Sequence, residues 1–290
     1  MKSLIKALCL GGLILILSVS TFAAAYYVDD NDPNDPGPYD PNVSNPLEDG
    51  SLNHPFDRVQ EAIEAAAHGD TVIVHPGQYQ YAGNVAFNGK NIALTSTNPE
   101  DPDVVAATIL DGGGNRSVVT FSGSETSDCI LRGFTITNGS SANGGGIIGN
   151  RTHAAIENCV ITGNTAYYEG GGLYRCDGPI ERCTVINNMV TLYNGGGLYE
   201  CHGSITNCTI NSNSANSDGG GLARCNGSIV NCKISDNTAV YNGGGLVTCV
   251  GNIQNCIIIG NAARGGGGLE DCDGTITNCT IVGNTAGNFF

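Results

Sequence analysis

Ile205-Thr206-Asn207-Cys208-Thr209-Ile210-Asn211-Ser212-Asn213, followed by Gly219-Gly220-Gly221-Leu222, is one copy of a motif that recurs along the second half of the chain. The cysteines of successive copies are separated by 24, 25, 24, 24 and 23 residues, and they are Cys159, Cys183, Cys208, Cys232, Cys256 and Cys279. An asparagine stands five residues after each of them: Asn164, Asn188, Asn213, Asn237, Asn261 and Asn284. A fixed period of this length is typical of a stacked array of repeats.

Within each copy the alternation Cys-x-Ile is that of a strand, and no stretch has both the spacing and the length of a helix. The repeat therefore predicts an all-β protein, a single-stranded parallel β-helix with one repeat of about 24 residues per coil. We expect each coil to have three sides and to rise by ~4.8 Å, one strand spacing. Equivalent residues then lie on top of each other, so that the cysteines and the asparagines form internal ladders along the axis.

A second set of cysteines precedes the first by seven residues in five of the six copies: Cys176, Cys201, Cys225, Cys249 and Cys272. Three interpretations stay open. Reduced thiols that pack as small apolar groups are the preferred one. Disulfides within each Cys-x6-Cys pair, or between stacked cysteines, are the second. A metal site is the least favoured, because no Cys-x2-Cys pair occurs.

The net charge limits the possible partners of the protein, and the amino-terminal segment indicates its location. The 290 residues include 27 acidic and 12 basic ones, and the net charge of −15 disfavours nucleic acid as a partner. Residues 1–25 read as a bacterial-type signal peptide, with Lys2 and Lys6 before an apolar run and Ala23-Ala24-Ala25 at the cleavage point. The apolar run is shorter than the ~20 residues of a membrane span, and the mature chain has no such segment. The sequence thus predicts a secreted protein, located extracellularly or at the outer cell surface.

Residues 26–53 are rich in Asp, Asn and Pro and are predicted to form a linker or an amino-terminal strand. A calcium loop is the alternative for this segment, because clustered carboxylates suit a hard cation. Its ligands would be Asp29, Asp30, Asp32 and Asp35, although the Gly and Glu framework of an EF-hand loop is absent. Apart from calcium, nothing in the sequence indicates a cofactor.

Residues 54–290 are assigned to the β-helix, with regular coils from about residue 130. Phe56, Val59 and Ile63 fall at helical spacing before Gly69, which predicts a short helix over 56–67 that covers the open amino end of the stack. Short strands are expected over 70–79, 91–96, 107–110 and 118–121. The last residues stop inside a repeat without a capping segment, so we expect either a fragment of a longer chain or a monomer.

The unit Ile-x-Asn-Cys-x-Ile-x-x-Asn resembles the right-handed parallel β-helix repeats of the pectin-lyase fold. The pairing of Gly-Gly-Gly-[Leu/Ile] with Ile-x-x-Asn is similar to the repeats of polymorphic outer-membrane proteins, which carry Gly-Gly-Ala-[Ile/Leu/Val] and Phe-x-x-Asn. The segment from Pro55 to Tyr79 resembles the amino-terminal cap and first coil of many secreted bacterial β-helix proteins. The resemblance implies the fold and leaves the activity open, because this fold hosts lyases, hydrolases, adhesins and surface proteins.

Pectate-lyase-like enzymes of this fold use calcium-binding acids and a basic residue, so the residues that flank the second cysteine set were considered for catalysis. Asp177, Glu200 and Arg224 are expected on three consecutive coils at one outer edge. Carboxylates beside an arginine suit acid–base chemistry. The same column also reads as alternating surface charge held in salt bridges, and this is the preferred interpretation.

A second column lies before the glycine tracts. Its candidates for carbohydrate contact are Tyr168, Tyr193 and Tyr241, with Glu169 and Asp218 beside them. Aromatic rings suit the apolar face of a sugar, and acids and amides suit its hydroxyl rim. The alternative is that these tyrosines only cover the glycine-rich corners.

Three functions follow from this sequence. The first is a secreted or surface β-helix that binds glycans, in the manner of an adhesin, without catalysis. The second is a polysaccharide lyase or glycoside hydrolase acting on an acidic polysaccharide. The third is a structural surface stalk.

Overall fold

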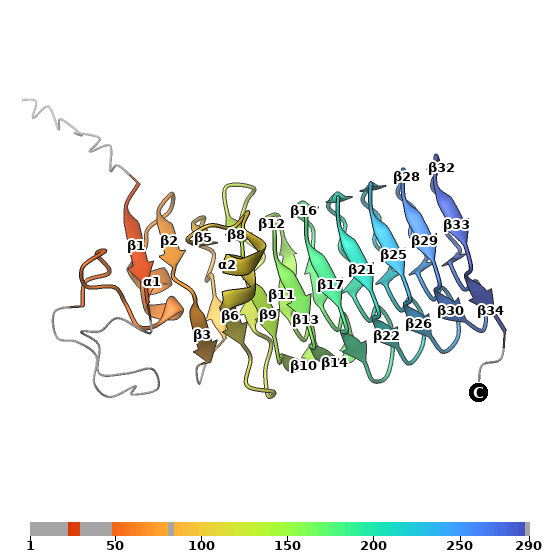
Figure 1. The fold of residues 1–290 in the computed structure, drawn as a ribbon, viewed down its shortest axis with the longest axis horizontal. Coiled ribbons are helices and arrows are strands. Elements are labelled where there is room, and N and C mark those ends of the chain that lie inside the picture. Colours follow the sequence, from red (N-terminus) through yellow and green to blue (C-terminus); the bar gives the residue numbers. More distant parts are fainter. Residues whose placement is uncertain (1–22, 30–47, 81–83, 288–290) are drawn as a thin grey trace, which may run out of the picture.

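The computed structural model describes residues 23–29, 48–80 and 84–287, and these residues form a parallel β-helix (Figure 1). The coils follow one another along a single long axis, from the orange amino-terminal end to the blue carboxyl-terminal end. Every strand pair between named strands is parallel, and most join residues about one repeat apart, as in Ile210 with Ile234. The prediction of a β-helix with one repeat per coil is confirmed.

The strands belong to four parallel sheets. The ten-stranded sheet contains β1 (Ala25–Val28), β2 (Thr71–Val74), β5 (Ala93–Ser96), β8 (Ile130–Arg132), β12 (Ala155–Glu157), β16 (Ile180–Glu181), β20 (Ile205–Thr206), β24 (Ile229–Val230), β28 (Ile253–Gln254) and β32 (Ile276–Thr277). The nine-stranded sheet contains β3 (Gly77–Gln80), β6 (Thr108–Asp111), β9 (Thr135–Thr137), β13 (Val160–Thr162), β17 (Thr184–Ile186), β21 (Thr209–Asn211), β25 (Lys233–Ser235), β29 (Ile257–Ile259) and β33 (Thr280–Val282).

The eight-stranded sheet contains β4 (Val85–Ala86), β7 (Val119–Thr120), β11 (Ile147–Thr152), β15 (Leu173–Cys176), β19 (Leu198–Tyr199), β23 (Leu222–Ala223), β27 (Leu246–Val247) and β31 (Leu269–Glu270). The seven-stranded sheet contains β10 (Ser140–Asn143), β14 (Thr165–Glu169), β18 (Met189–Val190), β22 (Ser214–Ala215), β26 (Thr238–Ala239), β30 (Ala262–Ala263) and β34 (Thr285–Ala286).

A regular coil has four short strands, and the expectation of three sides was therefore wrong. In the coil of β12 to β15, the chain bends between β13 and β14 at Gly163 and Asn164. Gly163 has a φ of 65°, which an L side chain rarely adopts. Asn164 then turns its side chain inward, so that the predicted asparagine bend divides one side into two strands.

The asparagine ladder runs through the interior at this bend. Asn213 is fully buried, and its Nδ2 donates hydrogen bonds to Val185 O (2.9 Å) and to Asn237 Oδ1 (3.0 Å). Its Oδ1 accepts from the N–H (3.0 Å) and the Nδ2 (3.0 Å) of Asn188. The same pattern joins the six asparagines named above, with Asn284 only half-buried in the last coil. Each buried amide thus has partners on both neighbouring coils, which removes the cost of desolvating it.

The cysteines form two further ladders and are all free thiols in the described residues. Cys208, for example, donates through its Sγ to Thr206 O (3.2 Å) and to Ile180 O (3.5 Å). Only Cys272 and Cys279, which belong to the last coil, are half-buried. Burial raises the pKa of Cys129 to about 12, so this thiol is inert at neutral pH.

The amino end is covered by the predicted helix. α1 (Val59–Ala65) buries Val59, Ala62 and Ile63 and packs against β1, β2 and β4. β1 extends the ten-stranded sheet beyond β2.

The second helix, α2 (Pro102–Ala107), was not predicted. Asp101 caps it by accepting from the N–H of Asp103 (3.0 Å), and Pro102 occupies the first helical position. Both features are ordinary helix-start signals. At the other end, Ile276 and Ile281 are 41% and 46% exposed, because no described coil follows theirs.

Candidate functional site

The outer edge predicted for chemistry is built on a left-handed turn at the end of five strands of the eight-stranded sheet, β15, β19, β23, β27 and β31. Five residues that directly precede the second cysteine set have a φ between 48° and 54°: Arg175, Glu200, Arg224, Thr248 and Asp271. Non-glycine residues adopt this conformation at a cost of about 1 kcal/mol or more. Its repetition on five coils shows that the turn is part of the coil itself, and it displays a column of polar side chains outside the core.

Glu200 is the centre of an ion-pair cluster at this edge. Its Oε2 lies 2.6 Å from Arg151 Nη2 and 2.9 Å from Arg175 Nε. Arg151 also reaches Asp177, with 3.6 Å between Nη1 and Oδ2. The side chains of Glu200 and Asp177 are only 15% and 14% exposed. Two guanidinium groups therefore pair with two carboxylates at a half-buried position.

The structure brings Asp177 and Glu200 to one cluster, and it leaves Arg224 out. Arg224 is exposed and forms no ion pair with any other described residue. Arg151 takes its place and was missed by sequence reasoning. The signal was present, because Thr152 pairs with Cys176 across β11 and β15, and Arg151 thus stands one repeat before Arg175.

This arrangement is poorly suited to acid catalysis. A general acid must hold a proton, and a lyase of the expected type needs carboxylates that are open to calcium. Here Oε2 of Glu200 accepts hydrogen bonds from both Arg151 and Arg175, so this oxygen is already occupied. The cluster has the features of a surface ion-pair network.

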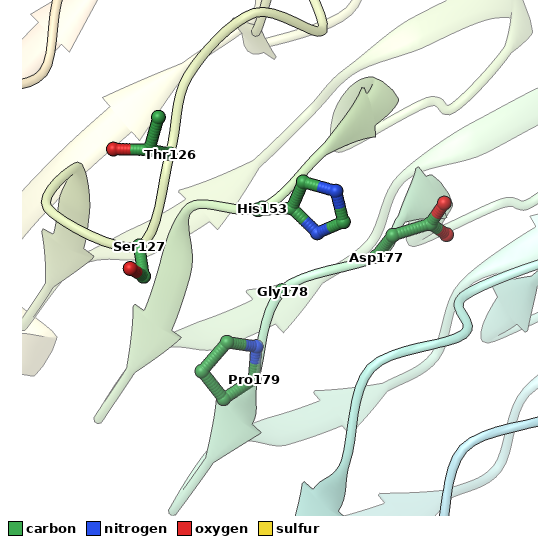
Figure 2. Close-up of a pocket in the computed structure, with 6 residues that line it drawn as sticks. All are labelled: Thr126, Ser127, His153, Asp177, Gly178 and Pro179. Atoms are coloured by element: carbon green, nitrogen blue, oxygen red, sulfur yellow. The ribbon is translucent and has the colours of Figure 1, made fainter.

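A shallow recess of about 370 Å³ adjoins the cluster through Asp177 (Figure 2). Its wall is formed by Thr126, Ser127, His153, Asp177, Gly178 and Pro179. In Figure 2 the side chains of His153 and Asp177 project from neighbouring coils, and the carboxylate of Asp177 points away from the imidazole. Asp177 Oδ1 also accepts from the N–H of His202 (3.2 Å).

Beside the cluster, outward-facing aromatic residues cover the eight-stranded sheet. Tyr174 and Tyr199 stack with ring centroids 5.9 Å apart, and Arg175 lies over the ring of Tyr174 at 4.8 Å. Tyr199 is only 3% exposed although it lies outside the coil. Burial raises the pKa of Tyr199, and a hydrogen bond with Glu169 raises it further. The carboxylate of Glu169 is therefore fixed by its hydrogen bond with Tyr199 on the eight-stranded sheet.

The predicted tyrosine column forms an exposed ridge, which we define as Tyr167, Tyr168, Tyr193 and Tyr241. Their exposed fractions are 54%, 40%, 47% and 50%. Tyr168 and Tyr193 stack with centroids 5.7 Å apart, and Tyr167 meets Tyr168 edge-on at 4.8 Å. Arg264 lies over the ring of Tyr241 at 5.5 Å. Tyr167 was not singled out from the sequence, because it has no counterpart in the other repeats.

Behind the tyrosines runs an outer ladder of hydrogen bonds. The N–H of Asp218 donates to Asn194 Oδ1 (3.0 Å), and the N–H of Asn242 donates to Asp218 Oδ1 (2.9 Å). Asp218 is half-buried beside the ridge. The carboxylates Glu169 and Asp218 are thus both fixed in place, but Glu169 is directed toward Tyr199.

The calcium candidates fall mostly outside the described residues. Asp30, Asp32 and Asp35 belong to that part, whereas Asp29 is described and lies 3.5 Å from His75 Nδ1. A different carboxylate cluster is found near α1. Oxygens of Glu48, Asp57 and Glu61 lie within 4.8 Å of one another. Oxygen ligands of this kind suit a hard cation, and spacing along the sequence gave no sign of the cluster.

Burial, together with the neighbouring Asp57 and Glu48, raises the pKa of Glu61 to about 7. The folded state therefore holds a proton that the unfolded chain, with its ordinary pKa near 4.5, releases earlier. The contribution to stability is complete below pH 4.5 and is lost as the pH rises through 7.

We accordingly expect Glu61→Gln to raise the urea midpoint at pH 8 relative to wild type, and to change it little at pH 5. Urea titrations followed by far-UV circular dichroism at both pH values provide the measurement. Glu64→Gln is the matched control, because Glu64 lies on the exposed side of the same helix. An equal shift at both pH values for Glu61→Gln would contradict the assignment.

Comparison with known proteins supports the fold and goes no further. No family model matches the chain, and no curated protein matches it. A crystal structure of a pectate lyase is similar, with a TM-score of 0.55 and 15% sequence identity, covering 88% of this chain and 67% of that one. A likeness at this identity shows the right-handed parallel β-helix alone. In the described residues, no helix has the length and apolar character needed to cross a bilayer.

Proposed function

We propose that the protein binds a neutral polysaccharide along the tyrosine ridge, without catalysis. The observation that carries the proposal is the ridge itself, with four tyrosines that are 40% to 54% exposed and lie on three of four successive coils. Folded proteins rarely leave large aromatic side chains together in solvent unless the surface makes contacts. The signal peptide expected from residues 1–25 would place this surface outside the cell.

The chemistry of the ridge suits sugars. A sugar ring offers an apolar face to an aromatic side chain and hydroxyl groups to polar neighbours. The tyrosine hydroxyls, the amide of Asn194 and the carboxylate of Asp218 supply such neighbours beside the rings. Since one coil rises by ~4.8 Å, a chain of sugars laid along the axis meets a new position of the ridge at each coil.

The charge of the protein favours a neutral glycan. The net charge of −15 repels a polyuronate, and no lysine or arginine other than Arg264 lies over a ridge ring among the described residues. The arginines of the ion-pair cluster are already occupied by Glu200 and Asp177.

Tyr168→Ala is expected to weaken the binding of a neutral hexasaccharide by about tenfold, because it removes one aromatic ring on which a sugar can stack. The probes are cellohexaose, xylohexaose and mannohexaose, titrated by calorimetry and by tyrosine emission, which is readable because the chain has no tryptophan. Ile257→Ala, an exposed residue of the nine-stranded sheet, is the control and should keep the wild-type affinity. Failure of the wild type to bind all three sugars would rule out the proposal.

A second candidate, a lyase acting on an acidic polysaccharide, is favoured by two observations. The similar solved structure is a pectate lyase, and the recess with His153 adjoins an arginine pair. If this function holds, polygalacturonate incubated with calcium must release unsaturated products, and Glu200→Gln must abolish that release. Glu181→Gln, which alters a different exposed ion pair, is the control. We expect no release from the wild type.

A further inference from the structure

The tyrosine ridge is interrupted at one coil, and the interruption has a defined geometry. The N–H of Ser217 donates to Tyr193 O (3.0 Å), and the N–H of Tyr241 donates to Ser217 O (2.9 Å). These bonds fix Tyr193, Ser217 and Tyr241 at equivalent positions of three consecutive coils. A small, half-buried serine thus stands where the coils before and after it carry a tyrosine.

Each of the two tyrosines is covered on the side away from this serine. Tyr168, on the preceding coil, stacks on Tyr193 with ring planes 20° apart. On the following coil, the guanidinium of Arg264 lies over the ring of Tyr241. Both rings are nevertheless about half exposed. The coil of Ser217 lies on the side of each ring that these neighbours leave uncovered.

The width of the gap selects what can enter it. Tyr193 and Tyr241 are two coils apart, which corresponds to about 9.6 Å. A flat group between two rings needs about 3.5–4.0 Å on each side, and hence about 7–8 Å in total. The gap is wider than a flat aromatic ring requires, and this extra width suits the thicker, puckered ring of a sugar.

Polar groups lie at the base of the same gap. Ser217 belongs to the coil that lies between the coils of the two tyrosines. Asp218 follows it, with a carboxylate held in place because Oδ1 accepts from the N–H of Asn242 (2.9 Å). A sugar between the rings would therefore place its faces against carbon and its edge against oxygen acceptors.

We infer that the gap between Tyr193 and Tyr241 is a subsite that holds one pyranose ring of the bound glycan, with Ser217 as its floor. The inference rests on the proposed function, since it names the position on the ridge that grips the chain. The tyrosines on either side then extend the contact to neighbouring sugars.

Ser217→Tyr tests the inference, because it fills the gap with the side chain that neighbouring coils already carry at this position. The fold should tolerate it, and circular dichroism and the melting temperature confirm that the variant is folded. We expect the affinity for the hexasaccharide that wild type binds to fall at least about tenfold. Ser217→Ala keeps the gap open and is the matched control, with an affinity within about threefold of wild type.

The outcomes separate this inference from the function on which it rests. If Tyr168→Ala weakens binding and Ser217→Tyr does not, the ridge binds glycan and the subsite is refuted. If Ser217→Tyr abolishes binding while Ser217→Ala retains it, the subsite is supported. If the wild type binds none of the three hexasaccharides, both the function and the subsite fail.

Discussion

Asn213→Ala is expected to lower the free energy of unfolding by about 4 kcal/mol, because it removes four hydrogen bonds from the interior at once. The substitution leaves Val185 O without its amide donor. It also takes the side-chain acceptor away from the amide nitrogen and the backbone N–H of Asn188, whereas Asn237 Oδ1 keeps the backbone N–H of residue 213. Each orphaned buried group costs about 1–3 kcal/mol. Stability in a stack is a property of neighbouring coils, so a break in the middle weakens both halves.

Urea titration followed by far-UV circular dichroism measures this effect. Asn216→Ala is the control, because Asn216 is exposed and its side chain donates one hydrogen bond, to Thr191 O (3.2 Å). That change should stay within about 0.5 kcal/mol of wild type. Equal midpoints for the two variants would show that the buried amides do not hold the coils together.

Gly227→Ala is expected to prevent folding, or to lower the free energy of unfolding by more than about 4 kcal/mol. A Cβ on Gly227 would overlap the carbonyl oxygen of Gly203 on the preceding coil, and a Cβ on Gly203 would overlap that of Gly178. The obstacle is backbone, so no side-chain rotation relieves it. The coils would have to separate at this corner, and the strand pairing on both sides would be lost.

Soluble yield and melting temperature of the purified variant measure this outcome. Gly265→Ala is the control, because the nearest atom to its added Cβ is the end of the Asn242 side chain, which can move. A Gly227→Ala protein that melts with the wild type would mean that the coils are not packed as closely as described.

The period of the sequence predicted the architecture because, in a stack of coils, residues that are one repeat apart in the sequence are neighbours in space. Residues 24 apart, such as Ile210 and Ile234, are paired in the sheet. The same rule placed the asparagine ladder and the tyrosine column. The rule missed Arg151 because the repeat was not traced back to the irregular coil that precedes the cysteine repeats, where Arg151 lies.

Features that depend on non-repeating segments could not be derived in this way. The carboxylates Glu48, Asp57 and Glu61 come from a loop and from α1, and only the packing of the amino end brings them together. For Arg224, the repeat predicted the position but not the contacts. Its register was predicted correctly, but the register does not determine which arginine reaches Glu200, and that choice depends on side-chain direction.

The measurement that tests the central claim most directly is the response of individual tyrosine rings to a neutral hexasaccharide, read by nuclear magnetic resonance on isotope-labelled tyrosine. We predict that cellohexaose, or whichever of the three hexasaccharides binds, shifts the ring signals of Tyr168, Tyr193 and Tyr241. The rings of Tyr174 and Tyr199, beside the ion-pair cluster, should stay unchanged. Shifts confined to Tyr174 and Tyr199, or no shift at the ridge under saturating sugar, would contradict the account.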